Sequence, residues 1–360
     1  MAIAGNKGEW SEIYALFKLL GDGKVYAGDA DLNRLNIYYP IINVIRQESK
    51  RYEYKPDSDK HIVVIDADGR KFASFSMNTF IEKSDELLVK IKSGANRSFE
   101  IPETEAFMKT IGCTRLKAPS DDKSDIHIVI HDLRTGMKLE LGFSIKSQLG
   151  SPATLLNATQ ATNITYKVEG RKLNNIEIAA FNVIPSHLQR MQAILDANLH
   201  LSYYDIEHPV FKNNLLFLDT CMPEFIAACL VCDSMPNGTP NIADAVKIVA
   251  KNNPFKFSGS NIEAFYVHKM KVLLLDAALG MTPSKEWTGK YDANGGYLVV
   301  KEDGDIVCYH FYNRNDVEDY LYNNTRFERG SRSRHHFGEL YRGDDGEVYI
   351  KLNLQIRFKK

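Results

Sequence analysis

The stretch from residue 124 to residue 150, SDIHIVIHDLRTGMKLELGFSIKSQLG, constrains the fold more than any other part of the sequence. Aliphatic and β-branched residues alternate with polar ones on both sides of LRTG, a short connection that contains a glycine. Two such runs with period-two alternation predict an antiparallel hairpin that buries one face. With the turn centred on the RT pair, the numbers of paired residues add to about 269. Asp125 is then expected opposite Ser144 and one pleat away from Lys146.

The two faces of this hairpin differ in chemistry. Leucine, phenylalanine and isoleucine are expected to enter a core from one face, at Leu139, Leu141, Phe143 and Ile145. The other face is expected to gather polar side chains, namely Asp125, Glu140, Ser144, Lys146 and Gln148. An acid and a lysine in a half-apolar sheet seldom stabilise a fold better than apolar residues of similar volume. The arrangement therefore suggests a function.

A metal-assisted nuclease centre is the functional interpretation of this pattern. The carboxylate of Asp125 and the carbonyl of Ile145 would bind a divalent cation, and Lys146 would orient or help to deprotonate the attacking water. An ordinary amphipathic hairpin with a solvated polar face is the alternative, because the motif D-(X)n-(D/E)-X-K is short and occurs by chance.

The residues around the hairpin also carry a family resemblance. GFSIKSQLGSPATLLNA, the preceding SDIHIVIHD and the N-terminal GNKGEWSEIYALFKLL resemble the HpaII family of type II restriction endonucleases, nearly from end to end. The resemblance implies a mixed α/β fold with a PD-(D/E)XK core, in which helices flank a mixed sheet, with an N-terminal insertion and a helical and β C-terminal region. It also implies Mg2+ dependence, a double-stranded DNA target resembling CCGG, and 5′-phosphate and 3′-hydroxyl ends. A bacterial restriction-modification role follows, with a cognate DNA methyltransferase as functional partner.

The sequence departs from the general nuclease motif at two positions. Ser144 stands two residues before the lysine, where an acid is usual, and Ser124 precedes Asp125, where proline is usual. A single carboxylate binds Mg2+ weakly, so the missing acid must have a substitute. Glu140 lies on the same face, but four residues along a strand span about 13 Å, which is too far to share one ion with Asp125.

The first helix offers a better source for the second carboxylate. Nucleases that resemble this fold usually take a glutamate from an N-terminal helix packed on the hairpin, and Glu9 and Glu12 lie three residues apart on one helical face. Glu12 is favoured over Glu9 because it lies deeper in the helix, beside an apolar stripe. Alternatively, both acids merely suit the positive N-terminal end of a helix.

Composition and charge set the remaining bounds. A chain of 360 residues with 44% hydrophobic residues can build a sizeable core and two or three structural units. Its formal net charge is -1, so a DNA-binding surface must concentrate positive charge locally. The absence of a long apolar run or a secretory signal leads us to expect a cytoplasmic protein without a membrane partner. The five cysteines are expected to be free, largely buried thiols.

Four parts are expected along the chain. These are an N-terminal helix packing on the nuclease core (1–24), an inserted α+β region (25–117), the catalytic hairpin and core (118–200) and a C-terminal DNA-recognition region (201–360). Helices are predicted over 8–20, the later half of 32–48, 78–92, 102–111, 186–198, 215–222, 225–233, 242–250, 262–280 and 315–324. Further strands are predicted over 61–66, 71–76, 176–183, 297–301 and 306–312.

Positive charge gathers at the C-terminal end. Between Arg326 and Lys360, nine Lys or Arg and two His face five acids. The segment RGSRSRHH predicts a loop suited to guanine edges and phosphates, through Arg329, Arg332, Ser333, Arg334 and His335. The segment EVYIKLNLQIRF predicts one strand whose polar face could read bases, through Lys351, Asn353, Gln355 and Arg357. A solvated strand face explains this pattern equally simply. Just after the hairpin, phosphate contacts are expected from Gln148, Ser151, Thr154 and Asn157.

The sequence thus predicts a Mg2+-dependent, site-specific DNA endonuclease with Asp125, Lys146 and a helix-borne glutamate at its centre. Two other classes stay open. One is a DNA-binding protein whose nuclease centre is inactive because Ser144 replaces an acid, and the other is a hydrolase that uses Ser144 and Lys146 as a nucleophile and base. A palindromic target requires two cuts, which either a homodimer or a monomer acting twice could make.

Overall fold

The computed structural model describes residues 2–95, 97–118, 124–291 and 294–360. Two compact units emerge. The first contains Met1–Ala153, Asp292–Tyr320 and Lys360, and the second contains Thr154–Tyr291 and Leu321–Lys359. The four-part division of the sequence stays a prediction, and the polar run 119–123 at the start of its third part lies outside the described residues.

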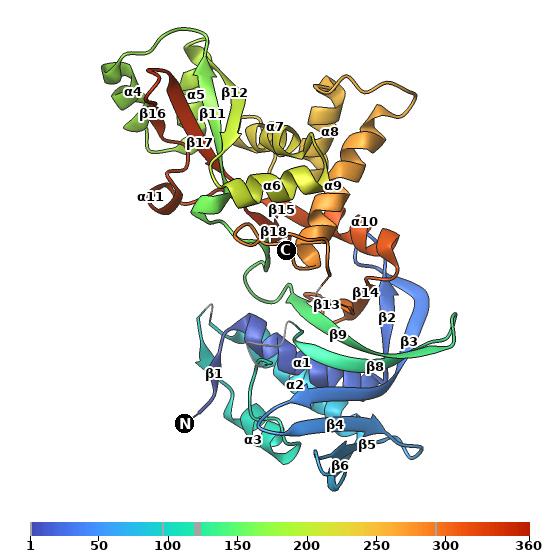
Figure 1. Ribbon diagram of the computed structural model, residues 1–360. Helices are drawn as coiled ribbons and strands as arrows, with labels where there is room; N and C mark the ends of the chain where they lie inside the picture. The colour runs from blue at the N-terminus through green and yellow to red at the C-terminus, as the bar shows by residue number, and fades with distance from the viewer. Residues whose placement is uncertain (1, 96, 119–123, 292–293) are drawn as a thin grey trace. The chain divides into compact units, whose positions relative to one another are not determined.

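The first unit is built on a nine-stranded sheet with the order β2-β14-β13-β9-β8-β3-β4-β5-β6 (Figure 1). An additional pairing between β2 and β3 closes six of these strands into a barrel. The sheet is mixed, because β13 runs parallel to β9 and β14 runs parallel to β2. Its strands are β2 (Lys24–Gly28), β3 (Arg34–Gln47), β4 (Arg51–Pro56), β5 (His61–Ile65), β6 (Lys71–Ser76), β8 (Ile126–Asp132), β9 (Met137–Ser147), β13 (Gly296–Val300) and β14 (Ile306–His310). A separate short pair is formed by β1 (Ala4–Gly5) and β7 (Phe99–Glu100).

The helix α1 (Lys7–Asp22) begins at a capping box and ends at a glycine. The side chain of Asn6 accepts a hydrogen bond from the backbone N–H of Glu9, and the Glu9 carboxylate accepts one from the N–H of Asn6. Gly23 follows the helix in the left-handed conformation, which glycine adopts without steric cost. The other helices of this part are α2 (Met77–Ser93), α3 (Pro102–Thr110) and α10 (Arg314–Asn324). The last residues of α10 belong to the second unit.

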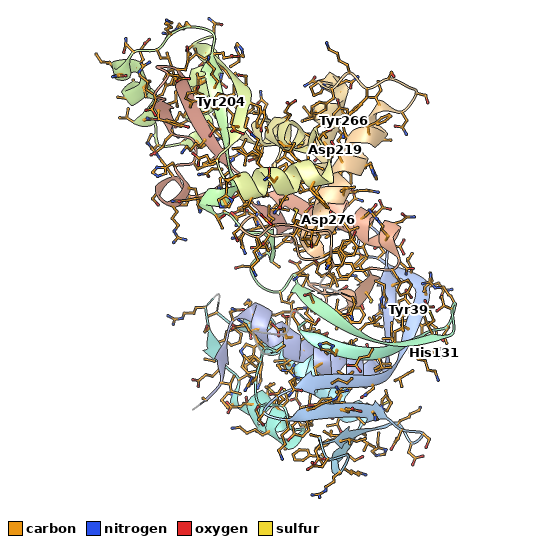
Figure 2. The ribbon with its side chains drawn as sticks, viewed as in Figure 1. Tyr39, His131, Tyr204, Asp219, Tyr266 and Asp276 are labelled. Atoms are coloured by element: carbon orange, nitrogen blue, oxygen red, sulfur yellow. The ribbon has the colours of Figure 1, made fainter. Side chains whose placement is uncertain are left out.

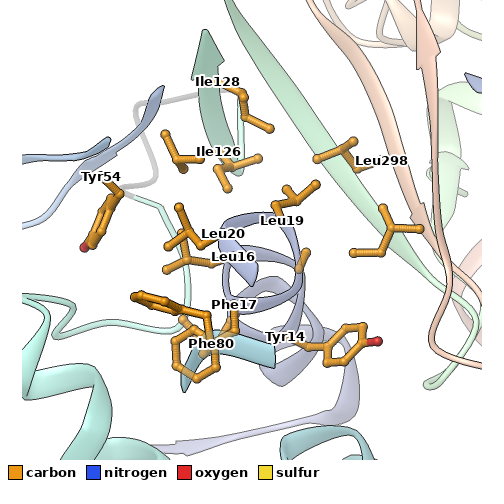
Figure 3. Packing of buried hydrophobic residues seen from close by; sticks show 14 of the residues in the cluster. Tyr14, Leu16, Phe17, Leu19, Leu20, Tyr54, Phe80, Ile126, Ile128 and Leu298 are labelled. Atoms are coloured by element: carbon orange, nitrogen blue, oxygen red, sulfur yellow. The ribbon is translucent and has the colours of Figure 1, made fainter. Parts of the chain in front are cut away.

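Helix α1 is buried on nearly all sides, and this burial fixes it against the hairpin. Figure 3 shows Leu16, Leu19 and Leu20 of α1 beside Ile126 of β8 and Leu298 of β13, all of them buried. A fully buried leucine or isoleucine stabilises a fold by about 1.5–3 kcal/mol relative to an exposed one. A polar side chain on this helix is therefore held in a defined place relative to β8 and β9.

The second unit combines two small sheets with a set of helices. An antiparallel sheet has the order β12-β11-β17-β16, and a shorter one has the order β10-β18-β15. The strands are β10 (Thr154–Leu156), β11 (Asn163–Glu169), β12 (His200–Ile206), β15 (Thr325–Phe327), β16 (Leu340–Arg342), β17 (Val348–Asn353) and β18 (Ile356–Phe358). The helices are η1 (Gln160–Thr162), α4 (Asn175–Asn182), α5 (His187–Asp196), α6 (Pro209–Leu218), α7 (Met222–Ser234), α8 (Ile242–Asn252), α9 (Ile262–Ala278) and α11 (Arg332–His335).

The helical layer of the second unit is joined by polar contacts as well as apolar ones. Asp219, at the end of α6, forms an ion pair with Lys269 of α9. Tyr266 of α9, labelled in Figure 2, is buried. It donates a hydrogen bond to Asn253, which follows α8. No single helix in the described ranges is long and apolar enough to cross a membrane, although α6 and α7 together pass that test as a bent pair.

The mixed α/β class and many of the predicted elements are confirmed. The structure contains the helices predicted over 8–20, 78–92, 102–111, 186–198, 225–233, 242–250, 262–280 and 315–324, with small shifts at their ends. It also contains the strands predicted over 61–66, 71–76, 297–301 and 306–312, and the first two and the last two form antiparallel pairs. All five cysteines are free; Cys221 and Cys232 are only partly buried.

Four of the predicted elements are wrong. The later half of 32–48 is not a helix but part of the 14-residue strand β3, where period-two burial governs the conformation. The strand predicted over 176–183 is the helix α4, which begins at a capping box of Asn174 and Glu177. The helix predicted over 215–222 ends at Leu218, and Met222 begins α7. The single strand predicted for EVYIKLNLQIRF is divided into β17 and β18, which belong to different sheets.

Candidate active site

The β8–β9 hairpin has the predicted register. Ile126 pairs with Phe143 and Asp132 pairs with Met137, so the numbers of paired residues add to 269. Leu141 and Phe143 are buried as expected, whereas Leu139 is 38% exposed, because it lies toward the turn end of the hairpin. The expectation that Leu139 enters the core is therefore wrong.

Asp125 is held at the open end of this hairpin by hydrogen bonds to the facing strand. Its backbone N–H donates to the carbonyl of Phe143 at 2.9 Å. Its carboxylate oxygen Oδ2 accepts from the backbone N–H of Ile145 at 2.6 Å. The carboxylate therefore reaches across the strand that carries Ser144 and Lys146, and its orientation is set by backbone groups.

Lys146 is partly buried and lies against an aromatic ring from a distant part of the chain. Its Nζ is 5.1 Å from the ring centroid of Tyr297 on β13, the strand parallel to β9. Burial lowers the pKa of Lys146, because it disfavours the charged ammonium, while the negative charges of Asp125 and Glu12 oppose this change. Lys146, Asp125 and Glu12 thus interact electrostatically at one site.

Glu12 differs from the other acids near the site in its environment. It is partly buried on α1, and its oxygen Oε2 has no hydrogen-bond partner among the described residues. Burial and the charge of Asp125 raise the pKa of Glu12 to about 8, against the opposing effects of Arg46 and Lys117. A cation bound here would stabilise the charged form of this carboxyl group.

Glu9, one turn earlier on α1, is already engaged. Its Oε2 accepts the N–H of Asn6 at 2.7 Å, and its Oε1 lies 2.5 Å from Nζ of Lys117. Burial acts to raise the pKa of Glu9, but the hydrogen bonds from Lys117 and Asn6 outweigh it and lower the pKa. The geometry therefore distinguishes Glu12, with an unused oxygen, from Glu9, which caps the helix.

A chain of hydroxyl groups connects α1 to β9 next to these residues. The N–H of Leu149 donates to Oγ of Ser147 at 3.1 Å, and the Oγ atoms of Ser147 and Ser11 are 2.8 Å apart. Since Ser11 donates to the carbonyl of Lys7 at 2.7 Å, Ser147 must donate to Ser11. Ser11 precedes Glu12 and Ser147 follows Lys146, so the chain fixes their relative position.

Arg46 of β3 lies close to the site, although no local sequence pattern predicts it there. Its Nε donates to Glu48 at 3.0 Å, its Nη2 donates to the carbonyl of Arg115 at 3.0 Å, and both Arg46 and Glu48 are 4% exposed. The second oxygen of Glu48 accepts two hydrogen bonds from Thr114. Arg46 thus anchors the segment around 114–115 to the sheet and acts on Glu12 through its charge.

The donor set fits a hard divalent cation with few protein ligands. Carboxylate oxygens are suitable ligands for Mg2+, which keeps several waters when it is bound by one or two carboxylates. One buried oxygen of Glu12 has no hydrogen-bond partner among the described residues, and the charge of Asp125 acts on Glu12. Within the described ranges, no group of three or more His, Cys, Asp or Glu side chains could hold a metal ion.

The predicted DNA contacts just after the hairpin are divided between the two units. In the first unit, Gln148 donates its N–H to the carbonyl of Val300, and its Oε1 accepts the N–H of Glu302 at 3.3 Å. Ser151 is exposed there. In the second unit, Thr154 pairs with Arg357 across β10 and β18, and Asn157 is exposed.

The basic segment RGSRSRHH is partly helical, and two of its arginines bind other protein groups. Figure 1 shows α11 in this segment. Arg329 lies 3.4 Å from a carboxylate oxygen of Asp233, and Arg332 donates to Glu339 at 2.7 Å and to the carbonyl of Asn182 at 2.7 Å. Arg334 is exposed. Ser333 and His335, the other residues predicted to contact DNA in this segment, make local hydrogen bonds. Oγ of Ser333 bonds to Oγ of Ser331, and Nδ1 of His335 accepts from the N–H of Ser331.

The alternative of a solvated polar face does not hold for part of the last strand segment. Asn353 is 1% exposed, and its amide nitrogen donates to Thr159, Thr162 and Asn163. Gln355 is 9% exposed. Lys351 forms an ion pair with Glu207. The alternation of the sequence could not reveal this, because the hydrogen-bond partners of Asn353 lie 190 to 194 positions earlier in the chain.

Comparison with known proteins identifies the chain. The model of the HpaII restriction endonuclease family matches residues 6–358. The chain is 46% identical over 358 residues to the type II restriction enzyme HpaII of Haemophilus parainfluenzae, covering 99% of this chain and 98% of that protein. No solved structure matches.

These similarities define a site-specific deoxyribonuclease of the type II restriction class, whose substrate is DNA. The chain belongs to the HpaII restriction endonuclease family, which confirms the family and the enzyme class predicted from the sequence.

Proposed function

We propose that the protein hydrolyses double-stranded DNA at a short palindromic site resembling CCGG in a Mg2+-dependent reaction. The first unit would then be its PD-(D/E)XK-like core, and the cut would leave 5′-phosphate and 3′-hydroxyl ends. The observation that carries this proposal is the mutual electrostatic influence of Glu12, Asp125 and Lys146 at the open end of the hairpin. Glu12 comes from α1 and takes the place of the acid that Ser144 replaces.

Glu12 and Asp125, with the carbonyl of Ile145 as a further oxygen, are the residues that would hold Mg2+. When bound there, Mg2+ supplies Lewis-acid stabilisation of the charge that develops on the phosphate and lowers the pKa of bound water. Glu9 is the weaker candidate, because both of its oxygens already bind protein groups.

Lys146 is proposed to orient the attacking water and to steady the negative charge on the phosphate. Burial lowers the pKa of Lys146, so its ammonium gives up a proton more readily than that of an exposed lysine. The backbone N–H of Ile145 keeps the Asp125 carboxylate in one orientation, so little reorganisation is needed during the reaction.

Sequence recognition is proposed for the C-terminal part of the chain. Arg334 in this part is exposed and suited to phosphate or base contacts. Ser151 and Asn157, which follow the hairpin, are also exposed and are suited to phosphate contacts. Arg329, Arg332, Lys351 and Arg357 would contribute where DNA replaces their present partners. A homodimer is one way to cut both strands of a palindrome, and a cognate methyltransferase would protect the host DNA.

Digestion of a sequenced plasmid by purified protein tests the proposal. With Mg2+ we expect discrete fragments whose mapped ends lie within one short sequence, and with a chelator we expect intact plasmid. Binding without cleavage at any divalent ion would support an inactive DNA-binding protein instead. Loss of activity in Ser144→Ala, together with full activity in chelator, would support the serine hydrolase.

A further inference from the structure

A second lysine stands beside the carboxylates of the candidate active site. Nζ of Lys117 lies 2.5 Å from Oε1 of Glu9, and the side chain of Lys117 is 60% exposed, whereas that of Glu9 is 20% exposed. Glu12 and Asp125 also act on Lys117 through their charges. The charges of Glu12 and Asp125 therefore act on two lysines, Lys117 and Lys146.

The two lysines differ in what they can reach. Lys146 is partly buried and lies over the ring of Tyr297. Lys117 is mostly exposed, and the chain just before it is anchored by the hydrogen bonds from Thr114 to Glu48 and from Arg46 to the carbonyl of Arg115. The chain is thus anchored two to three residues before Lys117, and the long, exposed side chain of Lys117 can turn toward solvent.

The charge balance of the site gives this exposed lysine a role. A DNA backbone carries one negative charge per phosphate and would approach the carboxylates of Glu9 and Asp125 and the carboxyl group of Glu12. An ion pair with one largely exposed partner, such as Lys117–Glu9, contributes little to stability, so its exchange for a phosphate costs little. The exchange also releases counterions from the DNA.

We propose that Lys117 is a DNA-contacting residue whose ammonium leaves Glu9 and pairs with a backbone phosphate beside the scissile bond. The inference rests on the proposed function, because it places the DNA at the carboxylates of α1 and β8. It adds a binding residue outside both the hairpin and the basic C-terminal segment.

Salt-dependent DNA binding tests this inference. Affinity of the full chain for a duplex that contains CCGG is measured by fluorescence anisotropy between 50 and 200 mM salt, with Ca2+ in place of Mg2+. Each phosphate contact contributes about 0.9 to the slope of log affinity against log salt. Lys117→Ala should lower the slope by about 0.9, so that the affinity ratio of wild type to variant shrinks about 3.5-fold across this range.

Matched variants distinguish the failures. Lys109→Ala removes another exposed lysine, which pairs with Glu105 on α3, and should leave the slope unchanged. Lys117→Arg keeps the charge and should keep the slope. An unchanged slope in Lys117→Ala, with unfolding by urea like that of wild type, overturns the inference. Absence of salt-dependent binding in the wild type itself would refute the proposed function rather than the role of Lys117.

Discussion

Replacement of Ser147 by alanine should lower the free energy of unfolding by about 1–3 kcal/mol and slow DNA cleavage. Oγ of Ser147 is the middle member of the hydroxyl chain, so its removal leaves the N–H of Leu149 without its acceptor and Oγ of Ser11 without its donor. Ser11 is 0% exposed, and water cannot easily replace the lost bond. A net hydrogen bond is worth about 1 kcal/mol, and an unsatisfied buried group costs about 1–3 kcal/mol.

The effect on cleavage follows from the neighbours of the two serines. Glu12 follows Ser11 and Lys146 precedes Ser147, so a looser junction between α1 and β9 shifts one catalytic group relative to the other. Displacement by about 1 Å can reduce a rate about 100-fold. Binding of DNA depends on other contacts and should change less than the rate.

Urea unfolding and single-turnover cleavage measure these two effects. Ser93→Ala is the matched control, because Ser93 is an exposed serine that donates only to carbonyls within α2, and its replacement should cost less than about 0.5 kcal/mol. The double variant Ser11→Ala with Ser147→Ala should cost less than the sum of the single variants. Unchanged unfolding and an unchanged cleavage rate in Ser147→Ala would refute the reasoning.

Two further predictions concern groups away from the hydroxyl chain. Burial tends to raise the pKa of Asp132, but the hydroxyl of Tyr312 and the donors of Arg134 lower it from 3.8 to about 2. The stability that Asp132 gives the folded protein is therefore complete above pH 3.8 and is lost as the pH falls toward 2. Asp132→Asn should therefore remove about 2 kcal/mol of pH-dependent stability in acid unfolding curves, and curves that keep it would contradict this assignment. Arg334→Ala should weaken DNA binding with unchanged unfolding, whereas Arg332→Ala should also lower the unfolding free energy by about 1–3 kcal/mol; equal stability of the two variants would be contrary to the observed contacts.

The hairpin could be predicted from the sequence because its information is local. Alternation with period two and a central turn set the register of β8 and β9, and the paired residues have the expected numbers. The helix around Glu12 was equally local, since its capping box lies within four residues. Local sequence patterns therefore predict both elements that carry the candidate site, the β8–β9 hairpin and the helix α1.

The surroundings of the site depend on residues far apart in the chain. Tyr297 reaches Lys146 only because β13 pairs in parallel with β9, some 150 positions earlier. Arg46 lies near Glu12 because β3 pairs with β8, although the sequence pattern of its segment favours a helix. No local pattern encodes either pairing.

Helix α4 shows a different limit. The apolar run IEIAAFNV suggested a buried strand, but Ile176 is 81% exposed and Val183 is 76% exposed. The capping box of Asn174 and Glu177 was the signal that decides for a helix. This short polar pattern therefore outweighs the hydrophobic composition of the run.

Cleavage rates of the acid variants test the central claim most directly. Single-turnover cleavage of a CCGG duplex is measured over a range of Mg2+ for wild type, Asp125→Ala, Glu12→Gln and Glu9→Gln. The account predicts rates at least about 100-fold lower at limiting Mg2+ for the first two variants, and a rate within about tenfold of wild type for Glu9→Gln. Cleavage by Asp125→Ala at the rate of the wild type would contradict the account.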